Sequence, residues 1–297
     1  MGGKSIMVYL CDGDVTGIVK CSLANWTGVA YKIPRTQLKQ AENIECLNQS
    51  GVYFLFGESD EGEPKVYIGQ AGSRKNGKGL MLRVSEHNAK EWWNTVVVFT
   101  TTNNWLGFTE ISWLENQFYQ MAKEVSRYRV ENANDPSGGN LTEERKADLD
   151  EYIDHVKIVI GNLGYKVFDP LNKEKTAISD NAESECEQIY IISTKKAEAS
   201  GKRTSEGFIV LKNSQIAQET TPTCSGSAIR AREKYSSKID KATWTTLEDL
   251  LFGSPSGAAS FVLGASSNGY DCWKNADGRT LGEIERKEDA DIFEEMK

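Results

Sequence analysis

Two apolar runs rich in β-branched and aromatic residues stand close together in the first third of the chain, at 52–56 and 66–68. Runs of this composition favour β-strands. The segment between them, 57–64, is acidic and contains Gly and Pro, which is typical of a connecting loop. The pattern predicts a β-hairpin with a long loop. Tyr53 and Tyr67 would then point from neighbouring strands toward one site.

Helical spacing of apolar residues follows the hairpin. Leu80, Arg83, Val84 and His87 are separated by three, one and three residues, so they occupy one stripe of a helix. Arg83 and His87 therefore share the face whose apolar members should pack inward. A cation on such a face needs partners, because burying an unpaired charge is unfavourable.

Two further helices are predicted downstream. One has a buried stripe that consists of Ile111, Leu114, Phe118, Met121 and Val125. Glu115 lies at the margin of this stripe, where a carboxylate can be half-covered and still reach a cleft. The other helix is predicted over 142–163, with Gly164 as its stop and His155 off its apolar stripe and exposed.

The composition along the chain suggests four stretches. Residues 1–47 form a β-rich lead-in, either a separate subdomain or an extension of the hairpin sheet, and residues 48–172 carry the hairpin and the three helices. Residues 173–203 are acidic, then weakly patterned, and are predicted to be a linker region. Residues 204–297 form a second small α+β unit.

Three local patterns define the second unit. The run 208–211 predicts a strand. Ser254 followed by Pro255 predicts the start of a helix that Gly264 ends. Turn residues on either side of 270–276 predict a terminal strand.

Length and composition limit the class of protein. A chain of 297 residues is long enough for two domains, and 39% apolar residues is ordinary for a globular protein. The sequence has no run of eighteen apolar residues and no signal-peptide pattern, so we expect no membrane association. The six cysteines are scattered and only two histidines occur, which argues against zinc or a disulfide framework and favours a reducing cytoplasm.

Charge is unevenly distributed. The net charge of −8 argues against a generic nucleic-acid binder, which usually carries a basic excess. The segment 65–90, however, holds six basic residues and one acid, Glu86; the basic residues are Lys65, Arg74, Lys75, Lys78, Arg83 and Lys90. This basic segment is either a solvated loop or a phosphate-contacting surface beside the predicted hairpin.

The hairpin and helices bring together residue types that phosphodiester cleavage requires. A tyrosine hydroxyl can orient or deprotonate water when positive charge or a proton relay assists it. Arg83 offers a permanently charged fork for phosphate, and Glu115 offers a hard oxygen ligand for Mg²⁺. Structural alternatives remain open: an ion pair between Arg83 and Glu115, buried tyrosines bonded to backbone groups, and a His87 that is simply at the surface or hydrogen-bonded within the fold.

The order of these residues resembles the GIY-YIG nuclease family. Gly51-Val52-Tyr53 matches the first motif with Val for Ile, and Tyr67-Ile68-Gly69 matches the second. Arg83, His87 and Glu115 match the helical positions. Gln70 follows the second motif where family members often have Lys, and Asn132 and Asn134 are both candidates for a late asparagine.

The resemblance implies a small α/β (α+β) domain whose three-stranded antiparallel sheet is flanked by helices. It implies that Tyr53 or Tyr67 acts as base or water orienter with help from His87, that Arg83 stabilises phosphate charge, and that Glu115 holds one Mg²⁺ or Mn²⁺. The activity implied is endonucleolytic cleavage of duplex or branched DNA, leaving 5′-phosphate and 3′-hydroxyl ends, in repair or in defence. Lys65, Arg74, Lys75 and Lys78 are the candidate DNA contacts.

The tail also resembles a C-terminal domain of unknown function that is often appended to such nucleases; the segments that carry this likeness are 207–211, 250–264 and 268–273. A role in positioning substrate or docking a protein partner is expected for it. If both DNA strands are cut by one kind of active site, either a homodimer or two sequential cleavage events is expected. The alternatives are a catalytically inactive nucleic-acid-binding module and a protein-interaction scaffold.

Overall fold

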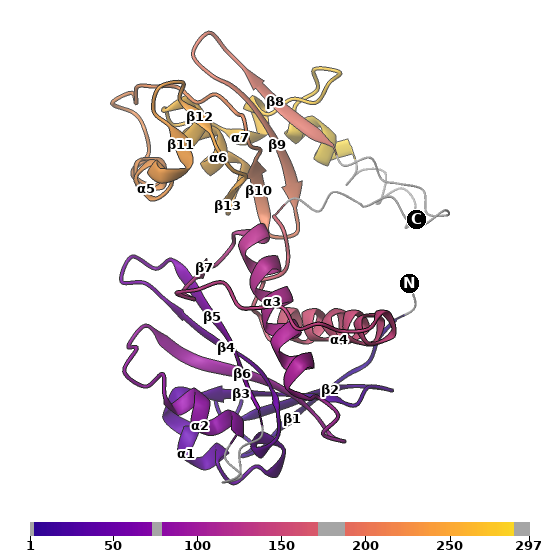
Figure 1. Cartoon of the computed structure of the whole chain (residues 1–297). Helices are drawn as coiled ribbons and strands as arrows, with labels where there is room; N and C mark the ends of the chain where they lie inside the picture. The colour runs from indigo at the N-terminus through magenta and orange to yellow at the C-terminus, as the bar shows by residue number, and fades with distance from the viewer. Residues whose placement is uncertain (1–2, 73–78, 172–187, 288–297) are drawn as a thin grey trace. The chain divides into compact units, whose positions relative to one another are not determined.

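The computed structural model describes residues 3–72, 79–171 and 188–287. The chain divides into two compact units, Met1–Pro170 and Leu171–Lys297, and each is described by itself (Figure 1). The architecture is mixed α+β in both units.

One seven-stranded sheet forms the centre of the first unit, with the strand order β1-β2-β3-β6-β4-β5-β7. The strands are β1 (Ile6–Leu10), β2 (Val19–Leu23), β3 (Gly28–Pro34), β4 (Gly51–Glu58), β5 (Pro64–Ala71), β6 (Trp93–Thr101) and β7 (Arg129–Val130). All neighbours are antiparallel except β5 and β7, which run parallel.

The predicted hairpin is confirmed as β4 and β5, and with β6 they form the expected three-stranded antiparallel core. The lead-in is an extension of this sheet, because β3 pairs with β6 along seven residues. In the hairpin, Tyr53 lies opposite Gly69 and Leu55 lies opposite Tyr67. The two tyrosines are therefore diagonal neighbours on one face of the sheet.

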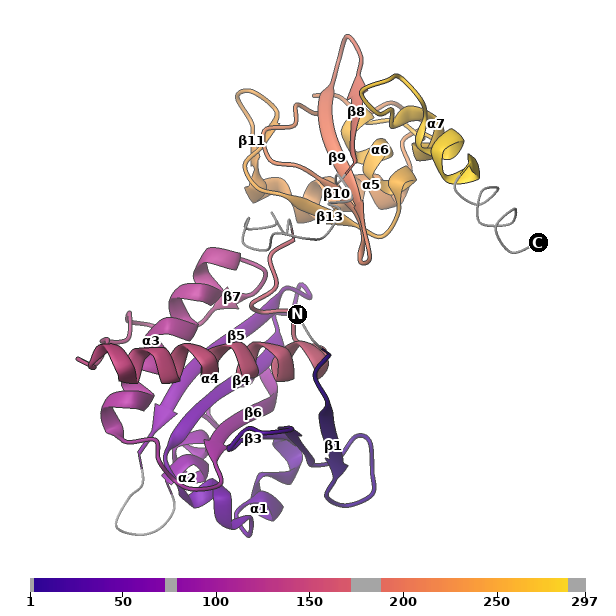
Figure 2. The same cartoon turned by 90° about the vertical axis from the view of Figure 1, so that its right-hand side faces the viewer.

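Helices cover both faces of the sheet, as Figure 2 shows. On one face lie η1 (Arg35–Gln37), α1 (Leu38–Ala41), η2 (Glu45–Asn48) and α2 (Gly79–Ser85); on the other lie α3 (Phe108–Val125) and α4 (Glu143–Asn162). Every residue of β4 except Glu58 is consequently buried. Val52, Phe54 and Phe56 face α3 and α4, whereas Tyr53 and Leu55 face α2.

The long helix α4 begins where the sequence predicts, after Thr142, whose side chain accepts a hydrogen bond from the backbone N–H of Arg145. The prediction for His155 was wrong, because this residue is buried. The indole of Trp26, from the β2–β3 connection, packs 5.3 Å from the imidazole between ring centroids. A residue off the apolar stripe is thus covered by a segment far away in the sequence.

The second unit contains a four-stranded antiparallel sheet in the order β13-β10-β9-β8. Its strands are β8 (Ile189–Ser193), β9 (Glu198–Thr204), β10 (Gly207–Val210) and β13 (Leu250–Phe252), with a separate small pair β11 (Ile239–Asp240) and β12 (Thr245–Thr246). Its helices include α5 (Gly226–Lys234), η3 (Ser236–Lys238), α6 (Pro255–Leu263) and α7 (Gly269–Cys272), and residues 281–287 are also helical.

The predicted linker, 173–203, needs correction. Its first part, up to residue 187, lies outside the described residues, but its last part forms β8 and most of β9. The inward residues Tyr190 and Ile192 alternate with exposed ones, of which Ile189 and Ile191 are apolar, and the alternation around Ala199 in β9 is interrupted by the buried Gly201 and Lys202. The second unit therefore starts earlier than residue 204.

The helix predicted after Ser254 is confirmed as α6. The Ser254 side chain accepts from the Gly257 N–H, and Gly264 ends the helix with φ +64°. The strand predicted over 270–276 was wrong, since Asn268 instead caps the short helix α7 by accepting from the Tyr270 N–H. Burial of Trp273 against Phe208, at 4.6 Å between ring centroids, anchors the segment that follows.

Within the described parts of the chain, none of the helices has the length and apolar character needed to cross a membrane.

Candidate active site

The hairpin tyrosines form the centre of the site. The Tyr53 and Tyr67 rings lie 6.3 Å apart between centroids, with 28° between their planes. Tyr53 is fully buried, and Tyr67 is partly exposed. Their side by side placement follows from the register of β4 and β5.

His87 contacts both phenols from the segment just after α2. Its Nε2 lies 2.9 Å from the Tyr53 Oη, and its ring lies 4.6 Å from the Tyr67 ring between centroids. Its backbone carbonyl accepts a hydrogen bond from the Trp93 indole at 3.0 Å, which fixes the turn. His87 therefore lies next to both phenols, as predicted. It does so from outside the helix, because α2 ends at Ser85 and the predicted helical stripe does not continue to residue 87.

Burial keeps the His87 imidazole neutral. Burial, together with the nearby positive charges of Lys90 and Arg83, lowers the pKa of His87 to about 4. A neutral imidazole has one nitrogen free to accept a hydrogen bond. When Nδ1 carries the proton, Nε2 accepts the Tyr53 hydroxyl hydrogen.

Gly51 and Gly69 lie so close to neighbouring atoms that a side chain at either position would collide with them. A Cβ on Gly69 would lie 2.4 Å from both Cζ and Oη of Tyr53, so the phenol rests on the bare backbone of β5. A Cβ on Gly51 would lie 2.1 Å from the Phe99 carbonyl oxygen in β6. Both motif glycines therefore have a steric role in shaping the hairpin.

The pKa values of both phenols are raised, chiefly because burial disfavours the phenolate. The positive charge of Arg83 opposes this shift at Tyr53 and at Tyr67, and the negative charge of Glu115 adds to it. Arg83 and Glu115 thus act electrostatically on both hydroxyl groups. The Lys90 ammonium lies 4.2 Å from the centroid of the Tyr67 ring and adds a second cation at this face.

Arg83 forms its ion pair within its own segment, with Glu86, three residues later. The hydrogen bond from Arg83 to Glu86 within this ion pair is also the main cause of the raised pKa of Arg83. Arg83 and Glu115, both of which are described, make no ion pair with each other. The ion pair between Arg83 and Glu115, one of the structural alternatives, is therefore absent.

Glu115 approaches β5 from the α3 side of the sheet, beside Gln70. Burial raises the pKa of Glu115 to about 7, and hydrogen bonding from Gln70 and the charge of Arg83 oppose the rise. The Gln70 amide is held in place, because its Nε2 donates to the Ser112 Oγ at 2.9 Å. Its Oε1 is buried and has no hydrogen-bond partner.

The oxygen atoms of Glu115 and Gln70 suit a hard cation such as Mg²⁺ better than Zn²⁺, which is mostly bound by nitrogen and sulfur ligands. Mg²⁺ is usually bound by one or two carboxylates and keeps several waters, so one carboxylate with an unpaired amide oxygen nearby is compatible with it. Within residues 3–72, 79–171 and 188–287, no three His, Cys, Asp or Glu side chains gather into a metal cluster. Beyond the Glu115 carboxylate and the Gln70 amide oxygen, an ion held here would thus need water or substrate oxygens as its other ligands.

Asn132, one of two candidate asparagines, contacts the hairpin. Its Oδ1 accepts from the Ile68 N–H at 3.0 Å, and its Nδ2 donates to the Ile68 carbonyl at 2.7 Å. The side chain therefore continues the pairing that β7 makes with β5 at Val66. Asn134 is exposed and makes no such contact.

The candidate DNA-contacting residues are only partly described. Lys65 pairs with Glu131 at 3.2 Å, so its charge is partly compensated. Arg74, Lys75 and Lys78 lie outside the described residues. Sequence reasoning did not assign Lys90, Gln70 or Ser112 a role in the site, although Lys90 belongs to the basic segment and Gln70 directly follows the second motif. Ser112 has no sequence signal.

Comparison with known proteins identifies one region. Residues 189–285 match the sequence profile of a domain of unknown function, DUF4357. This agrees with the expected C-terminal domain of unknown function and corresponds to the described part of the second unit. No curated protein and no solved structure matches the chain.

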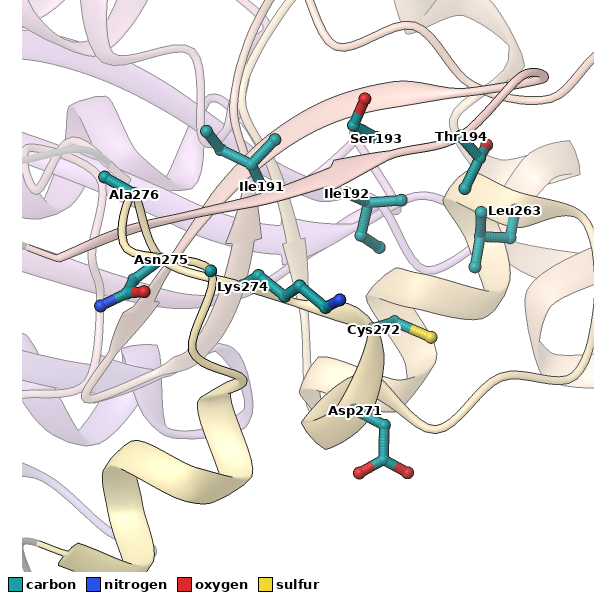
Figure 3. A pocket seen from close by; sticks show the side chains of 11 residues that line it. Ile191, Ile192, Ser193, Thr194, Leu263, Asp271, Cys272, Lys274, Asn275 and Ala276 are labelled. Carbon is teal, nitrogen blue, oxygen red and sulfur yellow. The ribbon is translucent and has the colours of Figure 1, made fainter.

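The DUF4357 region has a pocket of about 460 Å³ beside the edge strand β8 (Figure 3). Ile192, Ser193 and Thr194 line it from one side, and Cys272 and Lys274 line it from the other. The Lys274 side chain extends along the pocket toward Cys272 (Figure 3). Sequence reasoning placed no site here.

Proposed function

We propose that the first unit is a metal-dependent endonuclease of the GIY-YIG type that hydrolyses DNA phosphodiester bonds. The observation that carries this proposal is the hydrogen bond between Tyr53 and a neutral His87. The His87 ring also contacts the Tyr67 ring, and the positive charge of Arg83 acts on the imidazole. A buried phenol bonded to a neutral imidazole is a proton relay, because the imidazole can take the proton that the phenol receives. Both motif glycines support the same hairpin.

In the proposed reaction, a water oxygen attacks phosphorus and the bond from phosphorus to the 3′-oxygen breaks. Tyr67, the more accessible phenol, orients the water. The water proton passes toward the pair formed by Tyr53 and His87, and the departing 3′-oxygen takes up a proton from solvent. The products are a 5′-phosphate and a 3′-hydroxyl.

Arg83 is proposed to stabilise the charge on the phosphate oxygens, where its fork and permanent charge suit two oxygen atoms. Its present partner, Glu86, is exposed and on the same segment, so exchange of that partner for phosphate costs little. Glu115 is proposed to hold one Mg²⁺ or Mn²⁺. Such an ion supplies further charge stabilisation at the scissile phosphate.

The substrate is proposed to be duplex or branched DNA, in repair or in defence against foreign DNA, within the cytoplasm. Catalysis is assigned to the first unit alone. The DUF4357 region is proposed to position substrate or to dock a protein partner. The competing function is a nucleic-acid-binding module that keeps this scaffold without cutting.

The decisive experiment compares cleavage with binding. Supercoiled plasmid is incubated with the wild-type chain in Mg²⁺ or Mn²⁺, and nicked and linear forms are separated on a gel. Binding to a short duplex is measured by fluorescence anisotropy at several salt concentrations. The variant is Glu115→Ala, and the control is Glu124→Ala, on the exposed end of the same helix.

We expect nicking by the wild-type chain and by Glu124→Ala. We expect Glu115→Ala to lower the rate of plasmid nicking about 100-fold or more, while DNA binding persists and weakens as salt rises. If the wild-type chain binds duplex with that salt dependence but nicks plasmid in neither metal, the binding module is the better interpretation. If it binds no DNA even at low salt, both nucleic-acid functions are wrong.

A further inference from the structure

Lys90 lies in the candidate site but takes no part in the proposed reaction. Its ammonium lies 4.2 Å from the centroid of the Tyr67 ring, which belongs to the more accessible of the two phenols. A lysine over an aromatic face is attracted by the ring, and its aliphatic stem can pack there while the charge stays accessible. Lys90 therefore adds to Arg83 a second positive charge beside Tyr67.

The turn that carries Lys90 is held in place by hydrogen bonds. The Lys90 N–H donates to the His87 carbonyl at 2.9 Å. The Arg35 guanidinium donates to the Lys90 carbonyl at 2.7 Å and to the Asn88 carbonyl at 2.6 Å. It also donates to the Trp93 carbonyl at 3.1 Å, and its Cζ lies 4.6 Å from the centroid of that ring. Because one charged side chain bonds three carbonyls of this segment, the backbone at Lys90 has a fixed position relative to His87.

The Lys90 charge has no carboxylate of its own. Within the part of the chain that the structure describes, no Asp or Glu forms an ion pair with its ammonium. Burial lowers the pKa of Lys90 and the charge of Arg83 adds to this, whereas Glu131 opposes it. Glu131 is already paired, with Lys65 at 3.2 Å and with Arg129 at 3.1 Å. A partly desolvated cation next to another cation is stabilised when an anion binds beside it.

We propose that Lys90 binds the DNA phosphate next to the scissile one in the same strand. This inference rests on the proposed nuclease function, in which Arg83 takes the scissile phosphate. The Arg83 fork suits two oxygen atoms of one phosphate, and the point charge of a lysine suits another phosphate. A DNA strand carries one charge per about 3.4 Å of helix axis, so neighbouring phosphates offer an anion to each cation. The substrate is then a strand that continues past Tyr67, with the scissile bond inside it.

The position of the bound phosphate determines which kinetic constant Lys90 affects. A neighbouring phosphate does not react, so its contact is equally strong in the ground state and in the transition state. Loss of such a contact raises KM and leaves kcat unchanged. Loss of a cation from the scissile phosphate lowers kcat instead, because the charge there changes during the reaction.

The experiment compares three variants of the full chain. Lys90→Met removes the charge and keeps an apolar stem over Tyr67, and Lys90→Arg keeps the charge. Lys146→Met is the matched control, at an exposed position of α4. Binding to a short duplex is measured by fluorescence anisotropy from about 50 to 200 mM salt in a chelating buffer, and thermal unfolding checks each fold.

Two further measurements distinguish a phosphate contact from a structural role. Plasmid nicking in Mg²⁺ at pH 8 gives KM and kcat; at this pH His87 is neutral in every variant, because burial is the main cause of its lowered pKa. Acetylation of lysine amines by an activated ester, followed by mass spectrometry, reports which amines the duplex covers.

We expect Lys90→Met to weaken duplex binding about tenfold at the lowest salt, which is typical of a lost hydrogen bond to a charged group. The slope of log K against log salt should fall by about 0.9, as expected for the loss of one phosphate contact. KM should rise by a similar factor at unchanged kcat. Lys90→Arg should keep the wild-type slope, Lys146→Met should behave like the wild-type chain, and the duplex should slow acetylation of Lys90 but not of Lys146.

The proposal is overturned if Lys90→Met keeps the wild-type slope, or if the duplex leaves the acetylation of Lys90 unchanged. A lower kcat at unchanged KM would also overturn it, because Lys90 would then act on the scissile phosphate. Failure of the proposed nuclease function gives a different result. The wild-type chain would bind duplex with a slope that depends on Lys90 but would nick plasmid in neither metal, which keeps the phosphate contact and removes only the cleavage. A chain that binds no duplex at low salt would overturn both.

Discussion

At the residue scale, the contact between Gly69 and Tyr53 connects the motif sequence to the geometry of the site. The Tyr53 phenol occupies the space where any other residue at position 69 would have a Cβ. The same phenol is held by His87 on its other side. The glycine therefore sets the position of the hydroxyl relative to the imidazole.

This contact predicts the effect of Gly69→Ala. The added methyl would lie 2.4 Å from Tyr53 and would force the ring away from His87. We expect a loss of about 1–3 kcal/mol in the free energy of unfolding, which is typical of overpacking, and a loss of plasmid nicking. Urea unfolding measures the first effect. Gly253→Ala is the control, since no atom lies within 4 Å of its Cβ position; equal effects of the two changes would contradict the steric argument.

The raised pKa of Glu115 predicts that the stability of the fold depends on pH in the absence of divalent ions. The pKa of Glu115 is raised to about 7 by burial, so the folded chain favours the protonated acid. A group of this kind stabilises the fold at low pH, and its contribution is lost as the pH rises from 4.5, the ordinary pKa of this carboxyl, through about 7. Above pH 7 the folded chain carries a buried charge.

Glu115→Gln should therefore stabilise the fold at pH 8, by about 1–2 kcal/mol after allowance for solvent screening, and have little effect near pH 4.5. Thermal unfolding across pH 4.5–8 in a chelating buffer measures the difference. Glu124→Gln, on the exposed part of α3, serves as the control. A Glu115→Gln difference that does not grow between pH 4.5 and 7 would contradict the burial of this carboxylate.

At the scale of elements, the pairing of Asn132 with Ile68 continues the sheet edge where β7 stops. Two hydrogen bonds join this side chain to one backbone position next to Tyr67. Removing the amide leaves an N–H and a C=O of β5 without these partners. The end of β5 that carries the second motif should then open more often.

Asn132→Ala is expected to speed amide hydrogen exchange in residues 64–71 by about tenfold or more, which corresponds to about 1–3 kcal/mol of lost local stability. Hydrogen-exchange mass spectrometry of peptides from β5 measures it. Asn134→Ala, at an exposed position two residues later, should leave these peptides unchanged. Equal exchange in both variants would mean that Asn132 does not hold the strand.

The elements with strong local signals were predictable from the sequence. The hairpin follows from its apolar runs, α4 from its spacing and Thr142, and α6 from Ser254 and Gly264. The strand β9 was missed because it reads Glu-Ala-Ser-Gly-Lys-Arg-Thr, and its few inward residues are small. Local pattern cannot identify a strand whose stability comes from pairing on both sides.

The candidate site was predictable as a set of residues but not as a set of contacts. From the order of the motifs, Tyr53, Tyr67 and His87 were expected to lie together, and their side chains are in contact. The partner of Arg83 and the approach of Glu115 from the other face depend on how α2 and α3 pack. The role of Gln70 depends on Ser112, which has no sequence signal of its own.

At the scale of the whole molecule, the two units have separate hydrophobic cores. The two core clusters that flank the seven-stranded sheet contain residues of the first unit only, and the third cluster contains residues of the second unit only. Cooperative unfolding depends on a shared core. The units should therefore unfold as separate transitions.

Trp273 offers a way to test this independence. It is fully buried in the second unit, packs against Phe208 and donates from its indole to the Pro255 carbonyl at 3.0 Å. Trp273→Ala should cost the second unit about 3–5 kcal/mol, which is enough to unfold much of a marginally stable domain.

In the Trp273→Ala full chain, hydrogen exchange should lose protection across β8–β10 and α6, while β4 and β5 keep theirs. If the site lies wholly in the first unit, plasmid nicking should also survive whenever the wild-type chain shows it. Tyr270→Ala, which changes an exposed aromatic residue in the same segment, serves as the control. Loss of protection in β4 and β5 would mean that the two units unfold together, and the assignment of catalysis to the first unit alone would then have no structural basis.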